Sequence, residues 1–83
     1  MIVFNIDVHI GEGATRKKVS VWNPEFKTAV EEALSMLSDF GGLDDARAVL
    51  ICYYAVDGEF SHLLRYMPIS VDQFRALTME VME

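Results

Sequence analysis

The chain has few of the features that indicate a compartment or a membrane. It has one cysteine, Cys52, so no internal disulfide can form and the fold does not depend on an oxidising compartment. Its longest uncharged run is far shorter than the roughly 20 residues that cross a bilayer. Its first residues lack the basic start and small-residue cleavage site of a signal peptide. We therefore expect a cytoplasmic protein without a membrane partner.

Basic residues are also scarce, with seven Lys and Arg against thirteen Asp and Glu and a net charge of −6. Binding to nucleic-acid phosphates needs clustered cations, and the densest cluster here is Arg16-Lys17-Lys18. Direct nucleic-acid binding, which would depend on this cluster and Trp22, is therefore not expected. An acidic domain is instead steered toward basic surfaces. The alternative is that the charge only keeps a hydrophobic chain in solution.

Motifs for metal, cofactor or nucleophile chemistry are missing as well. The two histidines and the cysteine do not have the spacing of a zinc site. The glycines of 11–13 connect two predicted strands, whereas a phosphate-binding loop leads from a strand into a helix. Cys52 has no helix start or cation next to it in sequence that would activate its thiol. We expect neither a metal nor a cofactor.

What the chain does have is a strongly apolar middle. The run 49–56 carries no charge and is rich in β-branched and aromatic residues, which is typical of a strand covered on both faces. Asp57-Gly58 then favours a two-residue type I′ turn, so residues 59–67 are expected to pair with this strand. With that turn, Tyr53 would lie opposite His62 and Leu50 opposite Arg65.

The segments before this hairpin have clear periodicities. Apolar residues alternate over 2–10 and again over 18–22, which predicts two half-buried strands. Asn23-Pro24 predicts a helix start, with Asn23 as the cap and Pro24 in the first helical position. An apolar stripe then recurs at three- and four-residue spacing from Phe26 to Phe40, and Gly41-Gly42 is expected to end the helix.

The segment after the hairpin is less distinct. Ser70 and Gln73 have the spacing of a capping box, which predicts a second helix from residue 71. Residues 77–81 also fit strand alternation, so both helix and strand remain open for 71–83, with helix favoured. The order ββαββα over one domain, 1–83, predicts an α+β two-layer sandwich, in which two helices cover one face of a four-stranded, mainly antiparallel sheet. The order of strands in that sheet is left open.

A central strand that is apolar on both sides needs cover that one layer of helices does not supply. We therefore expect a small, acidic, non-catalytic protein-interaction module. It would form a homodimer through its open sheet face, or dock as an adaptor or inhibitor on a partner protein with a basic surface, including one that itself binds nucleic acid. The interaction residues expected are Trp22, Tyr54, Leu63, Met67, Glu31, Glu32, Asp39, Asp44 and Asp45.

The alternative is a small enzyme or ligand-binding protein with a site near Asp7 and His9, completed at an oligomer interface and including Tyr54. Asp7 and His9 lie two apart and share one side of the first strand, where a carboxylate can orient an imidazole as a general base. An ordinary solvated strand face accounts for the same pair, because residues two apart on a strand are always neighbours. We therefore do not expect catalysis.

Overall fold

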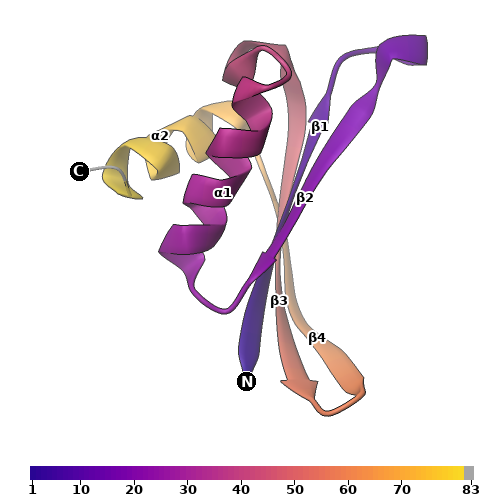
Figure 1. The fold of residues 1–83 in the computed structure, drawn as a ribbon, viewed down its shortest axis with the longest axis vertical. Helices are drawn as coiled ribbons and strands as arrows, with labels where there is room; N and C mark the ends of the chain where they lie inside the picture. Colours follow the sequence, from indigo (N-terminus) through magenta and orange to yellow (C-terminus); the bar gives the residue numbers. More distant parts are fainter. Residues whose placement is uncertain (82–83) are drawn as a thin grey trace.

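The computed structural model of the chain describes residues 1–81. Strands β1 (Ile2–Ile10), β2 (Lys17–Asn23), β3 (Ala46–Asp57) and β4 (Phe60–Ile69) form one antiparallel sheet in the order β2-β1-β3-β4. Helices α1 (Phe26–Ser38) and α2 (Val71–Val81) lie on the same side of it (Figure 1). The predicted α+β fold and the order ββαββα are confirmed, with two short 3₁₀ segments, Gly13–Thr15 and Gly42–Asp45, added in the connections.

The core lies between this sheet and the helix layer. Strand alternation points every second residue of β1, β2 and β3 toward the helices, and the stripe of α1 meets them. Phe74 of α2 completes the layer and is fully buried. The largest fully buried side chains are Phe74, Ile6, Leu37, Ile51, Val8, Val19 and Val30.

Helix α1 begins later than its cap signal predicts. The Glu25 amide donates to the Asn23 side-chain oxygen over 2.9 Å, but Asn23 still belongs to β2 and the helix begins at Phe26. The prediction that Asn23 is the N-cap and Pro24 the first helical residue is therefore wrong. Asn23 lies two residues before the N-cap, Glu25, and its side chain accepts a hydrogen bond in a local turn. A short polar side chain can stabilise such a turn as well as it can cap a helix.

Helix α2 is capped as the sequence predicts. The Gln73 amide donates to Ser70 Oγ over 3.0 Å, and the Ser70 amide donates to Gln73 Oε1 over 2.9 Å. The helix interpretation of this segment is confirmed over Val71–Val81. The remainder of the predicted segment, 82–83, lies outside the described residues.

The β3–β4 hairpin has a different register from the one expected. The turn residues are Gly58 and Glu59, Asp57 lies opposite Phe60, and Ala55 lies opposite His62. Gly58 has φ of +60°. Glu59 does not, because every residue with positive φ among 1–81 is a glycine. Positive φ at the first turn residue alone is the pattern of a type II′ turn. The register then shifts again, leaving Leu64 without a partner between the Tyr54–Leu63 and Tyr53–Arg65 pairs.

The hairpin extends beyond the helices. The β3–β4 turn and the N-terminus of the chain project past the helix layer at the end of the sheet away from the β1–β2 connection (Figure 1). Residues 60–66 of β4 are all exposed, and Phe60 and Leu64 are 72% and 58% exposed. This end of the sheet is therefore bare on both sides.

Candidate functional site

The sheet face opposite the helices carries a row of side chains that crosses all four strands. Trp22 of β2 lies opposite Asn5 of β1, Asn5 lies opposite Cys52 of β3, and Cys52 lies opposite Tyr66 of β4. Because side chains alternate along a strand, these residues share the face that no helix covers. The adjacent row toward the β3–β4 turn consists of Val3, Tyr54 and Leu63.

Large apolar side chains of these two rows are exposed. Trp22 is 55%, Tyr66 60% and Leu63 52% exposed, and all three lie on the same face as Tyr54. The ring centroids of Trp22 and Tyr54 are 5.0 Å apart with an angle of 44° between the rings, so the two aromatics pack on each other across β1. We call Trp22, Tyr54, Leu63 and Tyr66 the open-face cluster. Such a contiguous exposed cluster is typical of an interaction surface.

Cys52 lies beneath this cluster. Its side chain is 3% exposed although it belongs to the open face. Burial, with a smaller effect from the negative charge of Asp7, raises the pKa of the Cys52 thiol. Burial is also the largest cause of the raised pKa of Tyr54, and the nearby Cys52 and Asp7 raise this pKa by smaller amounts. Both groups are therefore neutral near pH 7, and the thiol is not activated as a nucleophile.

A polar network borders the cluster. The buried amide of Asn5 donates from Nδ2 to Val21 O over 3.1 Å and to Asp7 Oδ1 over 3.2 Å. The Ser20 hydroxyl donates to the same Asp7 oxygen over 2.5 Å. These contacts hold the Asp7 carboxylate against its own sheet. It is thus a structural acceptor that ties β1 to β2.

The residues of the predicted interaction set do not all lie together. Trp22, Tyr54 and Leu63 share the open face as expected, but Met67 lies opposite Ile51 and packs against the core on the helix side. Tyr66 takes the open-face position that Met67 was expected to have. The bulge at Leu64 causes both errors, because one extra residue moves every later side chain of β4 to the other face.

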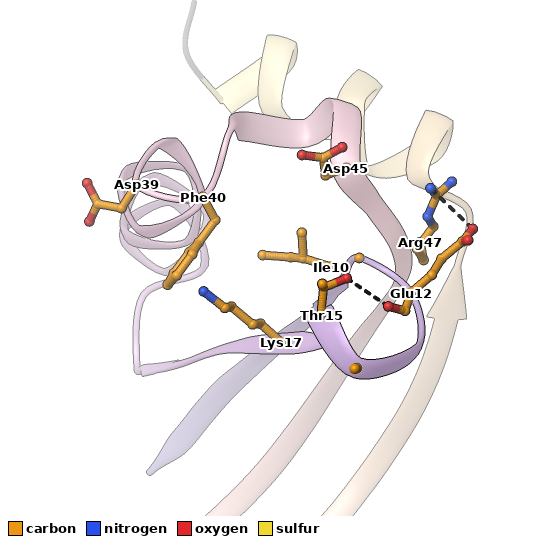
Figure 2. A pocket seen from close by; sticks show the side chains of 10 residues that line it. Ile10, Glu12, Thr15, Lys17, Asp39, Phe40, Asp45 and Arg47 are labelled. Atoms are coloured by element: carbon orange, nitrogen blue, oxygen red, sulfur yellow. Dashed lines mark hydrogen bonds and ion pairs between the residues drawn. The ribbon is translucent and has the colours of Figure 1, made fainter.

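The predicted acidic residues lie elsewhere. Glu31 and Glu32 are exposed on α1, and Asp44 and Asp45 lie in the 3₁₀ segment before β3. Asp44 contacts Arg75 of α2 at 3.8 Å. Asp39 and Asp45 line a hollow of about 750 Å³ between the end of α1 and the β1–β2 connection (Figure 2). These acids belong to the helix side, so they do not form a rim around the open-face cluster.

The same hollow contains part of the basic cluster. Lys17 Nζ lies 4.9 Å from the ring centroid of Phe40, and Figure 2 shows the two side chains next to each other. Lys18 points to the open face opposite His9, near the β1–β2 connection. Trp22 lies four residues further along β2, roughly 13 Å from Lys18 at the usual strand rise. The basic residues and Trp22 are therefore at different ends of the strand.

Asp7 and His9, the pair on which the enzyme alternative depends, have different surroundings. Asp7 bonds to Asn5 and Ser20, whereas His9 lines a hollow with Arg16 and Arg47 from which Asp7 is absent. Among residues 1–81, no group of three His, Cys, Asp or Glu side chains is arranged to hold a metal ion.

Neither of the two described helices is both long and apolar enough to span a bilayer. No family model, curated protein or solved structure matches the chain. Conclusions about function therefore depend on the residues themselves.

Proposed function

We propose that the chain is a small, non-catalytic interaction module that associates with a second copy of itself through the open face of its sheet. The observation that carries this proposal is the exposure of Trp22, Leu63 and Tyr66 on a face without helices, where Tyr54 packs on Trp22 and lies opposite Leu63. Trp and Tyr are the residues most often found at the energetic centre of protein interfaces, because they bury a large area at little cost in conformational entropy.

The size of the face supports a second copy as the occupant. Four strands about 4.8 Å apart and about nine residues long cover roughly 19 by 30 Å. A stable dimer buries about 800 Å² of accessible surface per partner. Because a surface of side chains has a larger accessible area than its flat projection, the open face is of the size that a dimer needs.

The charge distribution supports the same occupant. The chain carries a net charge of −6, yet the paired strand positions of the open face hold one acid, Asp7, and one base, Lys18, which cancel. The arginines at the far end of this face, Arg16 and Arg47, add no negative charge to it. Two copies that meet through this face would keep the acids of their helix sides at the outer surfaces of the dimer. Repulsion between the copies is then smallest in this arrangement.

The test is the molar mass in solution, measured by light scattering and sedimentation over a range of concentrations. We expect a concentration-dependent dimer, and we expect Leu63→Glu to weaken it at least a hundredfold, because the interface would bury an unpaired charge. Met79→Glu is the matched control, since Met79 is 68% exposed on α2, away from the open face. Circular dichroism and urea unfolding of each variant confirm that the fold is retained. A monomer at all concentrations, or equal weakening by both variants, contradicts the proposal.

A second candidate function is docking on a basic protein surface, as an adaptor or inhibitor. It is supported by the exposed carboxylates of Glu31, Glu32 and Asp39 along and just after α1. Polylysine is a suitable probe for this surface. The double variant Glu31→Gln/Glu32→Gln should bind polylysine more weakly than Glu80→Gln, an exposed control on α2. Equal binding by both variants contradicts this second candidate.

A further inference from the structure

A second hollow, of about 410 Å³, lies at the opposite end of the open face from the hairpin tip. It is lined by His9, Arg16 and Arg47, with Glu12 and two glycines of the β1–β2 connection. Lys18 lies next to it, opposite His9 in the β1–β2 pairing. A chain with few basic residues thus gathers several of them around one small volume.

The local charge of this hollow is positive although the chain is acidic. Glu12 supplies the one carboxylate among the lining residues and pairs with Arg47 at 3.2 Å (Figure 2). Within residues 1–81, no ion pair involves Arg16 or Lys18. Glu12 therefore neutralises Arg47, and the positive charges of Arg16 and Lys18 remain.

The backbone fixes the positions from which Arg16 and Arg47 extend. The Gly11 amide donates to Asp45 O over 3.1 Å, which ties the β1–β2 connection to the residue just before β3. Arg47 follows two residues later and is thereby held beside the connection that carries Arg16. The two attachment points are therefore fixed relative to each other, and binding an anion needs only the two exposed side chains, not the backbone, to become ordered.

We propose that this hollow binds the phosphate group of a small phosphorylated ligand. Guanidinium groups donate paired hydrogen bonds that match phosphate oxygens, and Arg16 and Arg47 supply two such groups. The volume lies in the range of small-molecule sites. Side-chain cations make the contacts, in contrast to a phosphate-binding loop, which uses the amides at a helix start.

The net charge selects a small ligand over a nucleic acid. Electrostatic interactions in physiological salt extend about 8 Å, so a single phosphate group experiences mainly the cations of the hollow. A polyanion would continue beyond the hollow over a surface with a net charge of −6 and would be repelled there.

The proposal is tested by titrating inorganic phosphate into the isotopically labelled chain at constant ionic strength, with sodium chloride as the reference salt. We expect saturable amide shifts confined to Gly11, Gly13, Arg16 and Ala48. A phosphorylated sugar should give the same pattern. A single-stranded oligonucleotide of equal phosphate concentration should bind more weakly.

Three variants make the test specific. Arg16→Gln should weaken phosphate binding about tenfold, the value of one charge-assisted hydrogen bond, whereas Arg65→Gln on β4 should leave it unchanged. Glu12→Gln should strengthen binding several-fold, because it frees Arg47 from its competing carboxylate. Absence of saturable shifts, equal effects of Arg16→Gln and Arg65→Gln, or tighter binding of the oligonucleotide overturns the proposal.

Discussion

Asn5 and Cys52 show how single residues determine the character of the open face. Both lie on the face without helices, yet they are only 3% exposed, because larger side chains of the same face lie over them. Asn5 can be buried there since its amide donates to Val21 O and Asp7 Oδ1. Cys52 is a small side chain with a raised pKa and behaves as part of the apolar layer.

The cover over Cys52 leads to a prediction about thiol reactivity. Tyr54→Ala should increase the rate at which Cys52 reacts with a thiol reagent about tenfold, because removing the ring opens the thiol to the reagent and to water. Burial is the largest effect on the pKa of this thiol, so relief of burial lowers the pKa by more than loss of the Tyr54 hydrogen bond raises it. The rate is measured at low protein concentration, where the face is free. Val56→Ala, two residues further along the same face of β3, is the control. Equal rates in the two variants would show that the reagent reaches Cys52 only through unfolding.

Among the elements, the β3–β4 hairpin has the largest influence on which residues become available. Its bulge at Leu64 decides that Tyr66, and not Met67, joins Trp22 and Tyr54 on the open face, whereas the type II′ turn shifts the pairing by two positions and leaves the faces unchanged. Since strand side chains alternate with period two, one inserted residue exchanges the faces of all that follow. The composition of the open-face cluster is therefore a consequence of the backbone geometry at Leu64.

The turn geometry can be tested by substitutions in adjacent residues. Gly58→Ala should lower the free energy of unfolding by about 1–2 kcal/mol, because Gly58 has φ of +60° and an L-residue is strained there. No atom lies within 4 Å of a Cβ built at Gly58, so the cost is purely conformational. Glu59→Ala should change the stability by only a few tenths of a kcal/mol, since Glu59 does not have positive φ. Urea unfolding measures both, and a larger loss for Glu59→Ala would contradict the assigned turn.

At the scale of the whole molecule, charge and apolar surface are separated. The acids of α1 and of the 3₁₀ segment before β3 lie on the helix side, whereas the open-face cluster lies on the other side of the sheet. The two proposed modes of interaction therefore use different surfaces. An apolar face favours a second copy, and an acidic helix layer favours a basic partner.

This separation predicts opposite effects of salt on the two modes. Raising the sodium chloride concentration should strengthen self-association a few-fold, because salt screens the repulsion between two copies of charge −6. Binding of polylysine to the helix side should weaken under the same change. Sedimentation at several ionic strengths measures the first effect. Self-association that weakens with salt would mean that contacts between opposite charges, and not the apolar face, hold the copies together.

Local patterns in the sequence predicted which elements form and how they are layered. The alternation over 2–10, the stripe of α1 and the capping box of α2 are local signals, because period and capping depend on residues a few positions apart. They were sufficient to predict the fold class, and they identified Trp22, Tyr54 and Leu63 as residues of the open face. The start of α1 was wrong by two residues, since Asn23 can form a local turn as readily as a cap.

Three features could not be predicted from local patterns: the order β2-β1-β3-β4, the register of β4, and the gathering of His9, Arg16 and Arg47 around one hollow. Each of these depends on contacts between residues distant in sequence. Asp57-Gly58 is compatible with more than one turn, and the bulge at Leu64 has no sequence signal that separates it from regular pairing. The packing of the whole sheet against its helices selects among these local alternatives.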